Sequence, residues 1–224
     1  MKMIRTPMLA LALVLFATPL LFGQDLSSYR KFSLGTSLAA LSKQVGQDLH
    51  HATLIHQSPA VIQELTYWPL ESSYSTGRAD PVSQILFSFY NGELYRMVVT
   101  YDQEAVAGLT EEDMVQAVSA RYGAGTRTYP EIDFPARDLF AQREIVIARW
   151  GNSQNSITLF HSILQNSFGL AVFSKRLDAQ ATAAIAESVK LEKEQAPQKE
   201  IDRQQKEAGD LDTARQKNRI NFRP

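Results

Sequence analysis

The sequence predicts an α+β fold in which tandem halves, each a helix plus a three-stranded antiparallel sheet, form one body followed by a C-terminal helical tail. Three observations lead to this prediction. Aromatic and β-branched residues cluster in short strand-like runs before Asp178. A capped amphipathic segment followed by three such runs occurs twice. After Asp178 the composition shifts to Ala, Glu, Gln, Lys and Arg, with neither Trp nor Tyr.

The N-terminal segment has the pattern of a secretory signal peptide. Lys2 and Arg5 precede an apolar run over residues 8–23, and polarity resumes at Gln24. As a helix this run would reach only ~24 Å, which is short of the ~30 Å hydrocarbon core of a bilayer. We therefore expect residues 1–23 to be cleaved, the protein to be periplasmic or extracellular, and no stable membrane anchor to remain. Retention of the segment as an anchor is the alternative.

Composition excludes several classes of function. Removing residues 1–23 from the 224-residue chain leaves 201 residues, and loss of Lys2 and Arg5 reduces the 23 basic residues to 21, against 24 acidic ones. A nucleic-acid partner is not expected, because it would require a basic patch. The chain contains no cysteine, so it has no thiol nucleophile, disulfide or lipidated cysteine. The body, residues 24–177, must gain its stability from core burial.

The first half, about residues 32–101, begins with a predicted helix. The segment from Thr36 to Gly46 has a capping residue at its start, an amphipathic pattern and a glycine at its end. Strands are predicted near residues 62–68, 85–90 and 94–101.

The last two of these strands are predicted to form a hairpin. Asn91-Gly92 separates them, and this dipeptide favours a type I′ turn because both central residues need positive φ. A two-residue turn would pair Phe89 with Leu94, Phe87 with Arg96 and Ile85 with Val98. Since both hairpin faces would be largely apolar, we expect a helix to cover one and the tail or a partner to cover the other.

The second half, about residues 108–175, repeats the plan. Thr110 precedes an acidic first turn over residues 111–113 and a helix that ends at Gly123, and strands are predicted near residues 144–150, 157–164 and 168–174. The acidic residues are interpreted as favourable charges at the helix N-terminus, not as an acid–base cluster.

The tail, residues 178–224, carries nine acidic and nine basic residues. Pro197 is predicted to break it into two helical pieces, with flexible chain beyond. Before Pro197 an apolar stripe is expected to dock on the body; it consists of Ala181, Ala184, Ile185, Ser188, Val189 and Leu191.

A resemblance to known families adds to this interpretation. The helix that opens after Phe32-Ser33-Leu34-Gly35 and closes at Val45-Gly46, followed by the Asn-Gly hairpin, resembles the module of the BamE/SmpA-OmlA-like and beta-lactamase-inhibitor-like proteins. The resemblance covers residues 32–101 and 108–175, and it implies an exported adaptor or inhibitor without enzymatic activity. As a whole the chain resembles uncharacterised exported bacterial proteins with a Phe-Arg-Pro end, here Asn221-Phe222-Arg223-Pro224 preceded by Asn218. No functional residue carries over from that resemblance.

Three of the four histidines lie close together, at positions 50, 51 and 56. His51 and His56 are separated by five residues, which is not the i,i+4 spacing that places two ligands on one helix face. We predict no metal site, although a loop would be able to bring these side chains together. His161 is predicted to lie within a strand, as an ordinary sheet residue.

Recognisable enzyme motifs are absent from the sequence, so no catalytic residue and no cofactor are predicted. Trp68 and Trp150 close corresponding strands of the two halves and would frame a groove if both lay at one end of the sheet. Together with Phe222 and Arg223 at the tail end, they are the candidate partner-binding residues.

The sequence therefore favours an exported, non-enzymatic binding or scaffolding protein of the cell envelope with a protein partner. The alternatives are an enzyme of unrecognised type and a small-ligand-binding domain with a groove near the sheet ends.

Overall fold

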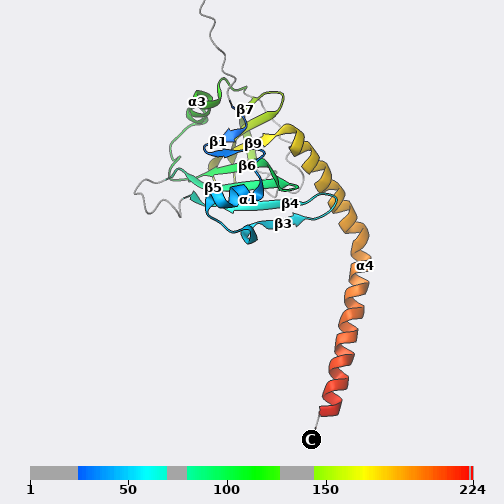
Figure 1. The fold of residues 1–224 in the computed structure, drawn as a ribbon. Coiled ribbons are helices and arrows are strands. Elements are labelled where there is room, and N and C mark those ends of the chain that lie inside the picture. Colours follow the sequence, from blue (N-terminus) through cyan, green and yellow to red (C-terminus); the bar gives the residue numbers. More distant parts are fainter. Residues whose placement is uncertain (1–24, 70–79, 127–143, 222, 224) are drawn as a thin grey trace, which may run out of the picture.

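One antiparallel sheet of seven strands organises the described part of the chain (Figure 1). The computed structural model describes residues 25–69, 80–126, 144–221 and 223. The strand order is β3-β4-β5-β6-β9-β8-β7. The elements are β1 (Ser28–Tyr29), β2 (Phe32–Ser33), α1 (Leu38–Val45), the 3₁₀ helix η1 (Leu49–His51), β3 (Thr53–His56), β4 (Ile62–Tyr67), β5 (Val82–Tyr90), β6 (Glu93–Tyr101), α3 (Glu111–Tyr122), β7 (Glu144–Gly151), β8 (Asn155–Ser162), β9 (Ser167–Ser174) and α4 (Lys175–Asn221).

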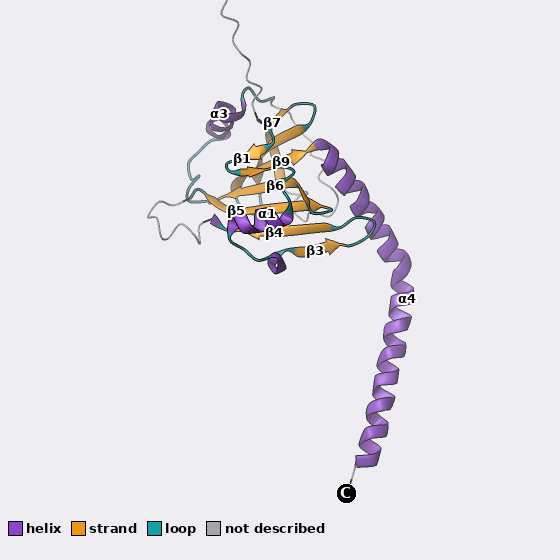
Figure 2. Ribbon diagram, in the orientation of Figure 1, coloured by secondary structure: helices purple, strands orange, loops and turns teal. Residues whose placement is uncertain are grey.

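The predicted α+β class is confirmed, and each of the six predicted strands is present as β4 to β9 (Figure 2). A seventh strand, β3, was not predicted. It lies in the histidine-containing segment and forms one edge of the sheet beside β4. The predicted signal peptide, residues 1–23, lies outside the described residues.

The two helix-plus-three-strand runs share a single sheet. In each run the third strand is innermost, and the two third strands, β6 and β9, pair antiparallel from Arg96–Phe173 to Thr100–Gly169. The core is therefore continuous across the joint.

Both short helices have the ends that their sequences predict. Ser37, the second residue of the predicted segment, is the N-cap of α1 and accepts a bond from the Ala40 N–H. Gly46 ends the helix in the left-handed conformation with φ of 73°. Thr110 and Asp113 form a reciprocal capping box at the start of α3. The hydrogen bonds from Thr110 lower the pKa of the Asp113 carboxyl, in agreement with a capping role for the acidic turn.

The hairpin turn is confirmed. Asn91 and Gly92 have φ values of 50° and 81°, and Phe89 pairs with Leu94 as predicted. Beyond that pair the predicted register is wrong by one residue, because a bulge at Tyr95 makes Ser88 pair with Arg96, so that Phe87 faces Met97 and Ile85 faces Val99.

The bulge determines which side chains of β6 point to each face of the sheet. One extra residue lets two consecutive side chains share a face of the sheet. Tyr95 packs in a cluster with Leu177 of α4, and Arg96 binds Asp178 of α4. Leu94 and Met97 are buried in the main core on the other side.

The main core lies on the face of the sheet that carries α1, α3 and the N-terminal segment. Its largest fully buried side chains come from that segment, from α1 and from β4, β5, β6, β8 and β9; they include Phe32, Leu41, Leu65, Ile85, Phe87, Phe89, Leu94, Met97, Ile157, Leu159 and Leu170.

The first part of α4 covers the other face, as predicted for the tail. Leu177 and Ala181 pack with Ile62 and Tyr95, and Ser188 is buried farther along the helix. Helix α4 begins at Lys175, three residues before the predicted tail boundary. Every described residue from Glu192 to Asn221 is exposed. Figure 1 shows this second part projecting away from the sheet.

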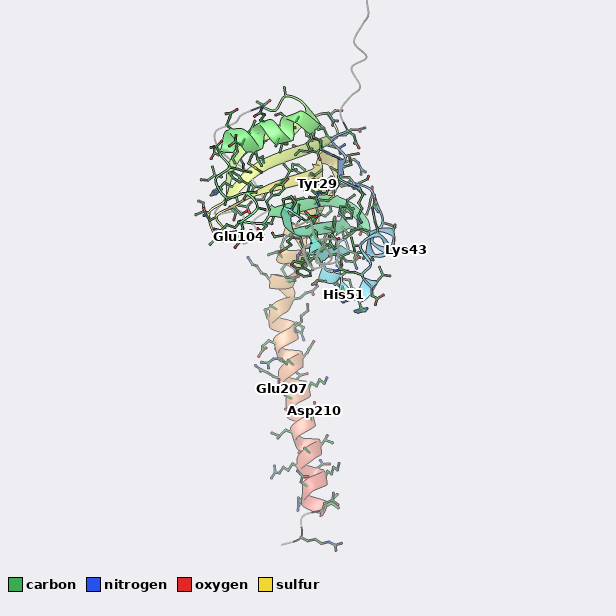
Figure 3. The ribbon with its side chains drawn as sticks, turned by 90° about the vertical axis from the view of Figure 1, so that its left-hand side faces the viewer. Tyr29, Lys43, His51, Glu104, Glu207 and Asp210 are labelled. Carbon is green, nitrogen blue, oxygen red and sulfur yellow. The ribbon has the colours of Figure 1, made fainter. Side chains whose placement is uncertain are left out.

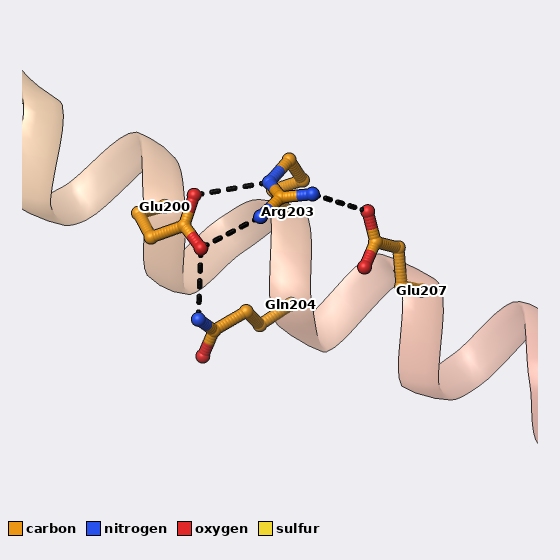
Figure 4. Close-up of polar contacts among 4 residues, drawn as sticks. All are labelled: Glu200, Arg203, Gln204 and Glu207. Carbon is orange, nitrogen blue, oxygen red and sulfur yellow. Dashed lines mark hydrogen bonds and ion pairs between the residues drawn. The ribbon is translucent and has the colours of Figure 1, made fainter.

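The predicted break at Pro197 is wrong, since α4 continues from Lys175 to Asn221 with Pro197 inside it. Proline removes one backbone donor, but the Ala, Glu, Gln, Lys and Arg residues on both sides of it favour a helix. Side chains one turn apart also bind each other just after Pro197; Gln198 binds Asp202, and Arg203 binds Glu207 (Figure 4). Within the described ranges, no helix combines the length and the apolar character needed to cross a membrane.

Candidate functional site

The two predicted tryptophans do not come together. Trp68 follows the end of β4, and Trp150 lies near the end of β7. Four strands separate β4 from β7, and because each neighbouring pair is antiparallel, β4 and β7 run in opposite directions. The ends of the two strands therefore lie at opposite ends of the sheet, and the tryptophans frame no shared groove.

Trp150 has a packing role. Its side chain is 2% exposed, and its indole N–H donates to the Gly123 carbonyl at 2.7 Å. The ring also covers Gly125, where an added Cβ would lie 2.5 Å from it. Trp150 therefore links the end of α3 to β7. Trp68, in contrast, is 45% exposed.

The predicted tail tip is described only in part. Arg223 is exposed, and Phe222 lies outside the described residues.

The histidines occupy two different environments. His50 and His51 lie exposed in η1 with their rings 4.3 Å apart, whereas His56 is buried in β3. His161 lies in β8 and packs edge-on against Phe168. Among the described residues, no group of three or more His, Cys, Asp or Glu side chains is arranged to hold a metal ion.

The structure brings His56 to two residues of α4 that sequence reasoning did not connect with it. Its Nδ1 lies 2.7 Å from Ser188 Oγ and 3.1 Å from Glu192 Oε1. A serine–histidine–carboxylate relay needs the serine and the carboxylate on different ring nitrogens. Here both contact Nδ1, which differs from that arrangement, and the grouping connects α4 to the edge strand β3.

The strongest candidate for a ligand site is a hollow of about 250 Å³ between α3, the loop before it and the sheet. We call it the tyrosine pocket, because Tyr29, Tyr101 and Tyr122 line it. Tyr29 and Tyr122 are buried, as are the apolar residues that complete the floor, which are Val106, Met114, Val118 and Leu170. Exposed residues form the mouth; these are Pro81, Ala105, Leu109, Ala117 and Arg121.

Polar contacts hold the edges of the tyrosine pocket. The Tyr122 hydroxyl donates to the Ser28 carbonyl at 3.0 Å. Next to Tyr29, the Arg30 guanidinium donates two bonds to Asp80, at 2.6 and 2.8 Å. The Asp80 carboxylate also accepts the Val82 N–H. The N-terminal segment is thereby tied both to α3 and to the start of β5.

Burial sets the charge state of the three phenols. It raises the pKa of Tyr101 well above the ordinary value, and Tyr29 next to it raises this pKa further. Burial also raises the pKa values of Tyr29 and Tyr122. All three therefore remain neutral hydrogen-bond donors in neutral solution.

The lining of the pocket defines what it can do chemically. Its described lining contains three phenols and one guanidinium but no carboxylate, histidine or lysine. Such a site lacks a general base for proton transfer near neutral pH. An apolar floor with a few polar groups at the edge is instead typical of a binding site.

The projecting part of α4 is the second candidate surface. We call residues 192–221 the arm. In Figure 3, Glu207 and Asp210 lie on the arm, far from Tyr29 in the body. Thirty helical residues extend for ~45 Å. The exposed apolar side chains of the arm are Ile201, Leu211 and Ile220.

Sequence reasoning missed the tyrosine pocket because its residues are distant in the chain. Tyr29, Tyr101 and Tyr122 come from β1, the end of β6 and the end of α3. Only one side of the pocket is visible in the sequence. Met114, Val118 and Tyr122 recur at helical spacing and mark the buried face of α3.

Comparison with known proteins finds no similar one. No family model matches the chain, and no match is found among curated proteins or among solved structures.

Proposed function

We propose that this chain is an exported, non-enzymatic binding or scaffolding protein of the cell envelope, and that its body presents the arm to a protein partner. The observation that carries the proposal is the way α4 is used. Its first turns are docked on the sheet, and the described residues that follow, from Glu192 to Asn221, are all exposed.

The arm is suited to reach a partner because, beyond the contact of Glu192 with His56, it stays helical with its described side chains exposed. Arg203 binds Glu200 and Glu207 on either side, each at 2.8 Å, and Gln204 also binds Glu200 at 2.8 Å (Figure 4). Pairs at this spacing each stabilise an exposed helix by ~0.2–0.5 kcal/mol. A helix that is polar nearly all round and laced with such pairs is typical of a spacer.

Charge and composition support a protein as the partner. The mature chain would carry 21 basic and 24 acidic residues, which disfavours a polyanion such as nucleic acid. Leu211, 72% exposed, and Ile220, 82% exposed, offer apolar contacts on the arm. Phe222 and Arg223 would extend this contact at the tip, and Trp68 is a further proposed contact on the body.

Export rests on the signal-peptide pattern of residues 1–23. After cleavage the protein would have no stable membrane anchor and would act in the periplasm or outside the cell. The repeated order of one helix and three strands supports a tandem origin of the two halves, with β6 and β9 as equivalent strands at the joint.

Site-specific photocrosslinking tests the proposal. A benzoylphenylalanine in place of Leu211 should give a discrete protein adduct in the native compartment. The same group in place of Lys43, an exposed position on α1 (Figure 3), is the matched control and should give none.

A variant that ends at Gln195, with the label in place of Lys193, completes the test. It should lose the adduct, because it lacks most of the arm. Adducts that form from Lys43 but never from Leu211 would place the partner on the body and contradict the proposal.

A further inference from the structure

The tyrosine pocket has the build of a small-molecule site that is separate from the arm. Its floor consists of buried apolar and tyrosine side chains, and its mouth is open at α3 and at the loop over residues 102–109. Its volume of about 250 Å³ is slightly below the usual range for ligand sites, which is ~300–1,000 Å³. A compact ligand with a substantial hydrocarbon part would therefore fit the floor.

The charge at the mouth selects the ligand's polar group. Arg121, in the last turn of α3, is exposed at the mouth, with its guanidinium carbon 5.4 Å from the centre of the Tyr122 ring. Among the described residues, no ion pair links Arg121 to an acidic side chain. The nearby Asp25 carboxylate accepts hydrogen bonds from Ser27 and Ser28. Arg121 also lowers the pKa of Asp25 electrostatically, but Arg121 lines the pocket and Asp25 does not, so the mouth presents a guanidinium to a ligand.

The phenols inside the pocket favour an acceptor as well. Burial raises the pKa values of Tyr29 and Tyr101, so both phenols stay protonated and keep an O–H group that can donate. A protonated phenol donates one hydrogen bond, so these side chains favour a ligand group that accepts one. A carboxylate only accepts hydrogen bonds, and guanidinium binds it strongly. An ammonium group would meet repulsion from Arg121 and find no acid in the described lining.

We propose that the tyrosine pocket binds a small aliphatic monocarboxylate, with its hydrocarbon chain on the apolar floor between α3 and β9 and its carboxylate at Arg121. Burial of the hydrocarbon chain removes apolar surface from water and so provides most of the affinity. The bond between the carboxylate and Arg121 sets the orientation of the ligand at the mouth.

Calorimetric titration with octanoate, below its micellar concentration, tests the proposal on the full-length protein. Octanoate should bind one-to-one, and affinity should rise about fourfold for each methylene along butyrate, pentanoate and hexanoate until the floor is full. Octanol should bind more weakly than octanoate, and octylamine should bind least.

Two variants locate the site. Arg121→Gln should weaken octanoate binding by about tenfold or more, since it removes a charge-assisted bond, and should leave octanol binding nearly unchanged. Ala117→Phe should fill the exposed mouth and abolish binding of both. The matched controls are Ala120→Phe, which adds the same ring on α3 outside the pocket lining, and Lys43→Gln, which removes a distant charge; neither should change binding.

Several outcomes would overturn the proposal. Equal binding of octylamine and octanoate would remove the role of Arg121. Binding that survives Ala117→Phe in a folded protein, judged from its circular dichroism, would place the ligand elsewhere. Absence of saturable octanoate binding would identify the hollow as a packing gap. None of these results bears on the arm, so the proposed function is tested separately.

Discussion

Arg96 in the central strand β6 binds Asp178 in the first turn of α4. The Nε and Nη2 groups of Arg96 donate to the same carboxylate oxygen, at 2.8 and 2.6 Å. Arg96 is 7% exposed, so the pair is largely removed from water. This contact links the first turn of α4 to the central strand of the sheet.

Replacing Asp178 with Ala should destabilise the protein by about 3 kcal/mol, because Arg96 loses two charge-assisted hydrogen bonds in a largely buried position. Urea denaturation measures this change. Asp202→Ala, which removes an acid from the exposed arm, is the control and should change stability by less than about 0.5 kcal/mol. Equal stability of the two variants would show that the contact contributes nothing to docking.

Local features were the most predictable part of this fold. Asn91-Gly92 needs positive φ at two successive residues, and few dipeptides other than Asn-Gly supply that easily. Thr110 and Asp113 are three residues apart and need only each other to cap α3. Such signals are complete within a few residues, so sequence alone identifies them.

Long-range features were not predictable in this way. Strand β3 was missed because its partners are β4 and, through His56, the distant Ser188. The bulge at Tyr95 places Tyr95 and Arg96 against α4, which is distant in the chain, and no glycine marks it in the sequence. Trp68 and Trp150 were paired by their place in the repeat, whereas the sheet order puts equivalent strands in opposite directions.

A second stability prediction concerns Gly169 and Phe160, which pair across β9 and β8. The Phe160 ring lies over Gly169, and a Cβ there would come within 2.1 Å of it. Phe160 is 2% exposed and has little room to move. Gly169→Ala should therefore cost ~1–3 kcal/mol through overpacking, as measured by urea denaturation.

The control for this prediction is Gly209→Ala in the arm, where nothing lies within 4 Å of the added atom. That change should raise helix content and stabilise the arm, by up to ~1 kcal/mol, since alanine is the better helix former. The double variant Gly169→Ala, Phe160→Leu should cost less than the sum of its single changes. Strict additivity would show that the ring does not limit this position.

The Arg30–Asp80 pair should make stability depend on pH. Burial alone would raise the pKa of Asp80, but hydrogen bonds from Arg30 and the Val82 N–H outweigh it and lower this pKa below the ordinary value. A lowered folded-state pKa gives stability that is present above the unfolded pKa of ~3.9 and is lost as the pH falls through the folded value.

Asp80→Asn should therefore be less stable than the wild type at pH 7, and the difference should shrink as the pH falls below about 4. Urea midpoints at pH 7 and pH 3 measure it. Asp210→Asn on the arm is the matched control and should give no difference at either pH. A difference for Asp80→Asn that stays constant between the two values would mean that the ionised carboxylate is not what stabilises the fold.

Truncation of α4 should separate its docked part from its arm. A chain that ends at Gln195 loses only residues that are exposed where they are described, so the unfolding midpoint of the body should stay within about 0.5 kcal/mol of the full-length value. A chain that ends at Gln180 also loses Ala181, Ala184 and Ser188, which are buried against the sheet. Its free energy of unfolding should fall by several kcal/mol, because this truncation exposes apolar surface around Ile62 and Tyr95.

Near-ultraviolet circular dichroism reports on the body in both chains, since every Trp and Tyr precedes Asp178. If the chain ending at Gln195 unfolded, the arm would be part of the structural core, and its proposed role as a contact for a partner would lose its support.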